Sequence, residues 1–305
     1  MLPSDSTHCI STVHTRHIKK RTIMSSSTIL MPTQASSRHV RFLKKLKSSL
    51  AFATPIVVVL LLWESVVMLG LVDARLLPPP HRVFGRAIEL VSDSNERVLL
   101  SHTGYSLLRA LAAFIIAALV AVPLGFALGL SRTLYVWTAP VLSLLLPLPA
   151  VAWTPILLVT LGRGDATIIC VCFLGAFFPI LYSTIQGVHA ISQHSIWVMR
   201  SMGASAWDIL FKLLVPSCLP TLLTGFKLGL AHSWRTLVAA EMLAAAAFGL
   251  GYMIFAARAY ADTASMFVGI AMLAVTGFFL EQILFGSIER ATVRRWYPQR
   301  GKRNQ

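Results

Sequence analysis

Residues 110–130 read ALAAFIIAALVAVPLGFALGL, an apolar run without a charged side chain over 21 positions. A helix of about 20 residues is long enough to cross the hydrocarbon core of a bilayer. Similar runs follow, and the whole chain is 56% hydrophobic and 13% charged, whereas a soluble domain has roughly 25% charged residues. The sequence therefore predicts an all-α, polytopic membrane protein.

The apolar runs predict six transmembrane helices joined by short links. They cover about residues 50–71, 104–130, 139–161, 165–188, 222–247 and 266–286, with links at 131–133 and 162–164. Residues 81–103 mix apolar and charged positions and predict a surface helix on the outer side. The third span contains Pro140, Pro147, Pro149 and Pro155, so we expect it to be kinked or broken, which suggests the wall of a pathway.

Charge decides the predicted orientation. Fifteen of the 27 Lys and Arg residues lie in residues 1–49 and after Phe285, and such clusters stay in the cytoplasm. We therefore expect a membrane protein with both termini in the cytoplasm, and basic tails at 1–49 and 291–305 around a transmembrane domain at 50–290. The net charge of +15 then reflects topology and anionic lipid rather than nucleic acid. Met24 and Met31 are alternatives to Met1 as the true start.

The sequence contains little evidence for an enzyme active site. The four cysteines are too few and too dispersed for a disulfide or zinc framework, and the nine histidines are scattered. We expect no metal or cofactor site, and without a Walker-type loop the energy of ATP must come from a partner. A membrane enzyme or an assembly scaffold is the weaker alternative to a transport subunit, and dependence on partners separates the two.

Residues 187–221 form the least apolar internal stretch and are expected in the cytoplasm. They predict a helix over 192–202, a left-handed turn at Gly203, and a second helix capped by Ser205 and Asp208 that ends near Pro216. Ile196, Trp197 and Met199 would then be exposed and would need a partner. The alternative is that this segment packs against lipid or the fourth span.

The stretch RSMGASAWDILFKLLVPSCLP at 200–220 resembles the cytoplasmic loop motif of ABC-importer permeases. In that motif Glu-Ala-Ala precedes Gly by three residues, and an aliphatic residue and Pro follow. Here Trp197-Val198-Met199 take the place of the triplet, Gly203 the glycine, and Leu213 with Val215-Pro216 the end. Further stretches are similar to the nitrate, sulfonate and taurine subfamily: LLPPPHRVF at 76–84, LPAVAWTPILLVTLGRGD at 148–165, GAFFPILYSTIQGV at 175–188 and LVAAEML at 237–243.

The resemblance implies a permease dimer in the bacterial inner membrane. It would bind two cytoplasmic ATPase subunits and receive a small anionic solute from an extracytoplasmic solute-binding protein. One six-span chain with one loop makes a homodimer the simpler expectation. A vitamin precursor or a methionine-like compound is the alternative cargo. Since Trp197 stands where the motif has Glu, we expect the loop to dock on its ATPase through apolar contact.

Five charged residues lie in the predicted spans: Glu64, Arg109, Arg235, Glu241 and Glu281. Each costs about 2.5 kcal/mol or more in hydrocarbon. We expect Arg109 to lie near an interface, and Arg235 and Glu241 to meet residues of other spans, since six positions place them about 240° apart on one helix. Arg235 either contacts an anionic substrate or pairs with Glu64 or Glu241. The candidate path residues are Arg235, Glu241, Glu64, Pro147 and Pro149, while His232 is interpreted as a packed helix residue.

Overall fold

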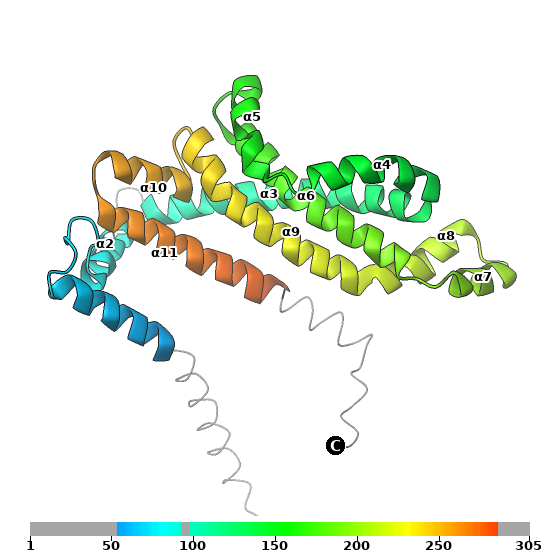
Figure 1. Ribbon diagram of the computed structural model, residues 1–305, viewed down its shortest axis with the longest axis horizontal. Coiled ribbons are helices and arrows are strands. Elements are labelled where there is room, and N and C mark those ends of the chain that lie inside the picture. The colour runs from blue at the N-terminus through cyan, green and yellow to red at the C-terminus, as the bar shows by residue number, and fades with distance from the viewer. Residues whose placement is uncertain (1–53, 93–97, 286–305) are drawn as a thin grey trace, which may run out of the picture. The chain divides into compact units, whose positions relative to one another are not determined.

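The computed structural model describes residues 54–92 and 98–285 (Figure 1). The predicted basic tails at 1–49 and 291–305 lie outside the described residues. The chain divides into two compact units, Met1–Val58 and Val59–Gln305, and the packing described below belongs to the second. Every element assigned in the described ranges is helical, which confirms the predicted all-α class.

A helix at Thr54–Met68 comes first in the described residues. The elements that follow are α2 (Pro80–Ser92), α3 (Val98–Leu130), α4 (Arg132–Leu145), the 3-10 turn η1 (Ala150–Trp153), α5 (Thr154–Leu161), α6 (Asp165–His189), α7 (Gln193–Ser201), α8 (Ala206–Asp208), the π-helical η2 (Ile209–Leu214), α9 (Val215–Ala244), α10 (Leu250–Ala259), α11 (Thr263–Phe279) and the π-helical η3 (Leu280–Phe285).

Four helices in the described ranges are long and apolar enough to cross a membrane. They are α3, α6, the continuous helix Ala206–Ala244, and the helix Thr263–Gln282. The pair Arg132–Leu145 and Ala150–Leu161 counts as a fifth if it forms one span. The first predicted span, at 50–71, is described from Thr54 only, so its crossing of the membrane stays a prediction.

The predicted proline break in the third span is confirmed. The helix axis turns by 86° between Leu145 and Ala150, and Pro147 and Pro149 stand in this turn, where they have no backbone N–H to donate. The predicted link at 131–133 is shorter than expected, because Ser131 alone separates α3 from α4. Ser131 accepts a hydrogen bond from the backbone N–H of Leu134 at 3.4 Å, so it caps α4 immediately after α3.

The outer surface helix predicted over 81–103 is wrong in its second half. α2 ends at Ser92 and α3 already begins at Val98, six residues before the predicted second span. Residues 92–97 read SDSNER and contain no apolar residue. This polar run is the sequence signal for the boundary, and the prediction of one helix over 81–103 overlooked it.

The helix that starts at Ala206 does not end near Pro216, as predicted, but continues to Ala244. Within this helix, the segment η2 just before Pro216 is π-helical. The backbone N–H of Val215 donates to Leu210 O, five residues back. The wider turn makes room for the Pro216 ring, which in a regular α-helix would clash with the carbonyl of the preceding turn. The elbow and the fifth span are therefore one helix.

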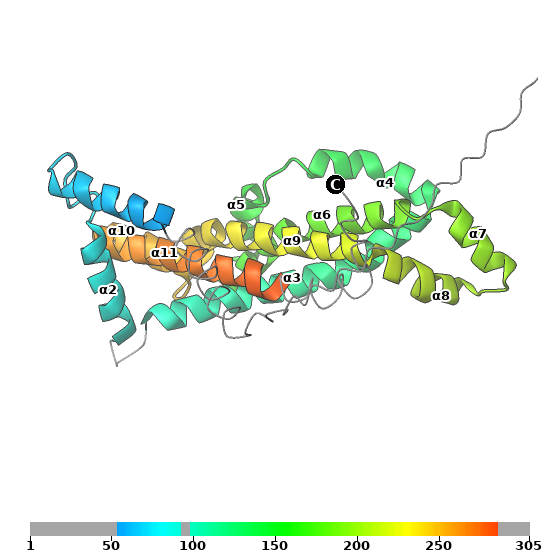
Figure 2. The ribbon, with the colours of Figure 1, turned by 90° about the horizontal axis from the view of Figure 1, so that it is seen from below.

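The helix α6 packs along both α3 and α9 (Figures 1 and 2). Glycines allow this close approach: a Cβ added at Gly125 of α3 would lie 2.6 Å from Thr184 Cβ, and one added at Gly225 of α9 would lie 2.5 Å from Ser183 Cβ. Small residues at helix contacts are typical of membrane proteins, where packing drives association. These three helices form the packed centre of the described unit.

Charged residues hold α2 against the start of α11. Arg86 lies 3.2 Å from the Asp262 carboxylate and donates to Ser265 Oγ at 3.0 Å. Asp262 caps α11 by accepting the backbone N–H of Ser265 at 3.0 Å. Burial alone would raise the pKa of Asp262, but the hydrogen bonds from Ser265 and the charge of Arg86 outweigh it and lower that pKa.

The short apolar helix α10 is absent from the sequence prediction, which has no helix between its fifth and sixth spans. It lies at the end of α9 opposite α7 and α8 (Figure 1). With ten residues it is too short to cross a bilayer. Hydropathy therefore gives no signal that separates it from a loop.

Candidate functional site

The elbow between α6 and α9 consists of α7, a glycine turn and α8, and its local geometry confirms the prediction. Ser192 caps α7 by accepting the Ser195 N–H at 3.3 Å. Gly203 has φ +80°, the left-handed region that favours glycine. Ser205 and Asp208 form a full capping box, in which each side chain accepts the backbone N–H of the other at 3.2 Å.

Apolar side chains cover the outside of this elbow. Trp197 on α7 is 64% exposed and Trp207 on α8 is 69% exposed. Trp207 stacks on Phe211 with ring centroids 5.8 Å apart. The exposed apolar patch consists of Trp197, Val198, Met202, Trp207 and Phe211.

The structure corrects the membership of this patch. Ile196 and Met199, predicted to be exposed, are only partly exposed. The rest of the predicted loop set lies in the same segment: Leu213 in η2 is partly buried, and Pro216 is the second residue of α9. The sequence analysis did not select Trp207 and Phe211, although both residues lie within the motif.

Ion pairs satisfy most of the charged residues within the spans. Glu241 pairs with Arg109 at 2.9 Å, Glu64 lies 2.7 Å from His81, and Glu281 lies 3.6 Å from Lys227. Arg109 is 7% exposed and also pairs with Asp165 at the start of α6 at 2.7 Å. That it lies near a membrane interface stays a prediction. The expectation that Glu241 meets another span is confirmed.

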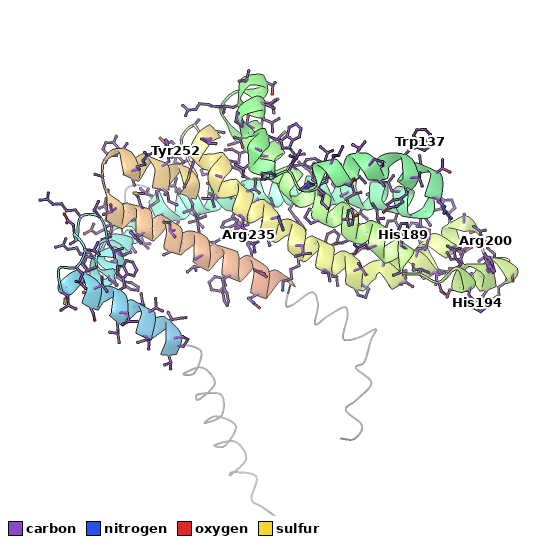
Figure 3. The ribbon with its side chains drawn as sticks, viewed as in Figure 1. Trp137, His189, His194, Arg200, Arg235 and Tyr252 are labelled. Atoms are coloured by element: carbon purple, nitrogen blue, oxygen red, sulfur yellow. The ribbon has the colours of Figure 1, made fainter. Side chains whose placement is uncertain are left out.

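Arg235 differs from these residues. It forms no ion pair within residues 54–92 and 98–285, so the predicted pairing with Glu64 or Glu241 is wrong. It lies in the second half of α9, between Tyr252 on α10 and Arg200 on α7 in the view of Figure 3. Arg235 lines a cavity of about 190 Å³ together with Lys227 and Glu281. Two positive side chains and one negative side chain thus face the same space.

The face of α9 that carries Arg235 is exposed in the single chain. Thr224, Leu228, His232 and Arg235 are all exposed and follow one another at intervals of four, four and three residues, so they share one side of the helix. His232 is therefore not packed inside the described unit, contrary to its interpretation from sequence. Polar side chains in a membrane-spanning helix face protein or water rather than lipid.

The other predicted path residues do not join Arg235. Glu64, Glu241, Pro147 and Pro149 are absent from the lining of its cavity. Glu241 is fully buried instead, against Arg109 and Ser106. The two prolines are exposed in the break between α4 and α5.

Sequence reasoning missed the partnership of Arg109 with Glu241. The two residues are 132 positions apart in the chain, and spacing carries no signal at that range. The only available signal is chemical, because two opposite charges in apolar spans each need a partner.

Comparison with known proteins identifies the family. The family described as "Binding-protein-dependent transport system inner membrane component" matches residues 121–292. The taurine transport system permease protein TauC of Escherichia coli (strain K12) is 32% identical over 278 residues, covering 90% of this chain and 99% of that protein. The putative aliphatic sulfonates transport permease protein SsuC of Bacillus subtilis (strain 168) is 30% identical over 220 residues, covering 72% of this chain and 78% of that protein.

Among solved structures, an inward-facing conformation of the MetNI methionine ABC transporter is similar with a TM-score of 0.57 and 20% sequence identity. It covers 66% of this chain and 99% of that chain. At that identity the likeness establishes a shared fold. Together with the sequence matches, it identifies the chain as a polytopic permease subunit that belongs to the family of inner-membrane components of binding-protein-dependent transport systems.

Proposed function

We propose that the α7–α8 elbow of this permease binds a cytoplasmic ATPase subunit and passes its movement to α9. The observation that carries the proposal is the continuity of the helix Ala206–Ala244, whose first turns carry Trp207 and Phe211 of the exposed apolar patch. At 1.5 Å per residue, 39 helical residues extend over about 58 Å. A displacement of the elbow therefore acts directly on a membrane-spanning helix, without an intervening hinge loop.

The proposal extends to the assembly around this permease. ATP is hydrolysed by the partner subunits, while this chain itself carries out no catalysis and binds no cofactor. The basic termini and the elbow face the cytoplasm, and α10 faces the extracytoplasmic solute-binding protein. A second copy of the permease meets the exposed face of α9, which puts Thr224, His232 and Arg235 between the two copies rather than against lipid.

The solute of the proposed importer is a small anion of the sulfonate, taurine or nitrate class. Arg235 supports this, because it has no ion-pair partner in the described residues and lines a cavity with Lys227. Planar guanidinium groups bind oxyanions through two parallel hydrogen bonds. The names of the relatives, which concern taurine and aliphatic sulfonates, support the same class of solute.

Replacement of Gly203 by Ala tests the elbow. A Cβ at Gly203 meets no heavy atom within 4 Å, so the substitution acts through its φ of +80°, at a cost of about 1–2 kcal/mol. Gly162→Ala in the link between α5 and α6 is the control outside the elbow. Gly162 has φ +78° and equally open space, and its ψ of −175° makes the backbone strain of alanine at least as large.

The measurement is the amount of ATPase subunit that co-purifies with the permease in mild detergent, together with its ATP hydrolysis. We expect Gly203→Ala to lower both and Gly162→Ala to leave both unchanged. Equal behaviour of the two variants, or a wild-type permease that binds no ATPase in several detergents, would refute the proposed role of the elbow.

A further inference from the structure

A buried polar network surrounds Glu241 near the end of α9. Glu241 is fully buried and accepts hydrogen bonds from Ser106 Oγ at 2.8 Å, Arg109 Nη1 at 2.9 Å and the backbone N–H of Gly251 at 2.9 Å. Burial of an unpaired charge is costly, so this carboxylate needs all three donors. Loss of one donor is therefore expected to loosen the whole cluster.

The same network holds the first turn of α10. The backbone N–H groups that open a helix have no acceptor within it. Here Gly249 N–H donates to His102 Nδ1 at 2.9 Å, Leu250 N–H donates to Ser106 Oγ at 2.8 Å, and Gly251 N–H donates to Glu241. The polar anchors of this first turn are thus side chains of α3 and α9.

Two glycines show how closely this turn fits. A Cβ at Gly249 would lie 2.5 Å from the Glu241 carboxyl carbon, and a Cβ at Gly251 would lie 2.5 Å from Val238 O. Contacts this short exclude any larger residue unless the backbone moves. The turn and Glu241 are consequently fixed relative to each other.

Arg109 extends the network to two further segments. Its Nη1 donates to Phe248 O in the loop before α10 at 2.6 Å, and its Nε donates to Asp165 Oδ1 at the start of α6 at 2.9 Å. Side chains of α3, α6 and α9 therefore meet the loop and α10 at one point. Along the rest of their length, the glycine contacts already hold α3, α6 and α9 together.

We propose that Arg109, Ser106 and Glu241 are positioning residues that make α10 move with α9, so that a displacement at the elbow reaches the extracytoplasmic loop. This inference rests on the proposed function, because it takes the elbow as the place where force enters. α10 lies at the opposite end of α9 from the elbow (Figure 1). Apart from the chain itself, through residues 245–249, the contact between α10 and α9 is otherwise apolar, with Leu250, Met253 and Ile254 in the same buried cluster as Leu237 and Ala240. The network supplies the directional hydrogen bonds of this contact.

The test uses the full permease complex with its co-purified ATPase subunits in lipid nanodiscs. Amide hydrogen exchange is followed by mass spectrometry in ADP and in ATP with orthovanadate, for peptides from the elbow (193–208) and from the loop and α10 (245–259). In the wild type we expect both peptides to change their exchange rate severalfold between the two nucleotide states.

Two variants then separate the segments. In Ser106→Ala and Glu241→Gln, the elbow peptide is expected to respond as in the wild type, while the response of the 245–259 peptide falls at least threefold. Glu89→Gln is the control, since Glu89 is an exposed carboxylate on α2 outside the network. In this control, the exchange rates of both peptides should change with nucleotide as in the wild type.

The outcomes distinguish this inference from the proposed function. If the wild-type elbow peptide does not respond to nucleotide, the proposed role of the elbow fails. If the elbow responds and the 245–259 peptide of Ser106→Ala still responds fully, the positioning role is overturned. If Glu241→Gln does not assemble, the result for Ser106→Ala alone tests the positioning role. This variant removes the hydrogen bonds of Ser106 to Glu241 and to the Leu250 N–H, and it leaves the ion pair of Arg109 and Glu241 in place.

Discussion

Substitution of glycine by alanine is predicted to destabilise the protein at Gly225, inside the contact between α6 and α9, and to stabilise it at Gly104, outside that contact. A Cβ added at Gly225 would lie 2.5 Å from Ser183 Cβ and 2.9 Å from Ser183 Oγ, whereas nonbonded carbons pack at about 3.5–4.0 Å. The helices would have to separate by roughly 1 Å, and such overpacking costs about 1–3 kcal/mol. Gly104 on α3 has no heavy atom within 4 Å of its added Cβ, so Gly104→Ala is expected to stabilise the helix by up to about 1 kcal/mol.

Thermal unfolding in detergent, scanned at one fixed rate, measures both effects. For a chain of this size we expect Gly225→Ala to lower the midpoint by roughly 2–12 °C and Gly104→Ala to raise it by a few degrees. The double variant Ser183→Gly with Gly225→Ala removes the opposing Cβ and should recover most of the loss. An unchanged midpoint in Gly225→Ala, or no recovery in the double variant, would show that α6 and α9 are not packed as described.

Three further predictions concern the solute, the elbow and α2. Arg235→Gln should reduce uptake of a short sulfonate by about 10- to 100-fold, because a charge-assisted hydrogen bond contributes roughly 1.5–3 kcal/mol. Normal uptake in this variant, or equal loss in the control Arg132→Gln at the exposed start of α4, would remove Arg235 from the path. Ser205→Ala breaks the capping box and should cost about 1 kcal/mol, seen as faster amide exchange in the elbow and contradicted by unchanged exchange. The pKa of Asp262 is lowered, so its ionised carboxylate stabilises the fold above the ordinary pKa range of Asp, and this stabilisation is lost as the pH falls through the pKa of the folded state. Wild type and Asp262→Asn should therefore differ in melting midpoint at pH 7 and converge in acid. A difference that does not change with pH would contradict this.

Local signals in the sequence predicted the elbow well. Ser192, Gly203, Ser205 and Asp208 act through residues at most a few positions away, as caps and a turn. Such contacts depend on spacing along the chain, which a sequence displays directly. The proline break before α5 was predictable for the same reason.

Other features depend on partners that lie far away in the sequence. The π-helical register of η2 lets the helix pass Pro216, although proline ordinarily ends or kinks a helix. The pairing of Arg109 with Glu241 joins two helices, and the network around it gives α10 its place. Apolar periodicity carries no information about these arrangements, since it reports burial and not partners.

Exposure in the elbow was predicted only in part, for a geometric reason. The motif indicates which residues stand near the turn, but the direction of each side chain depends on how α7 packs against η2. Trp197 is exposed, whereas Ile196 and Met199 are partly covered. Trp207 and Phe211, which stack on each other, are exposed on α8 and η2, and spacing along the chain gives no signal for which side of this helix is covered.

Photo-crosslinking at Trp197 tests the central claim, the docking of the elbow on an ATPase, most directly. Benzoylphenylalanine replaces either Trp197 on α7 or Trp137 on α4, which is 79% exposed and lies outside the elbow (Figure 3). After irradiation of membranes, mass spectrometry identifies the crosslinked partner. The account predicts a covalent adduct with an ATP-binding-cassette subunit from position 197 and none from position 137. Equal adducts from both positions, or no ATPase adduct from position 197 or from Trp207, would contradict it.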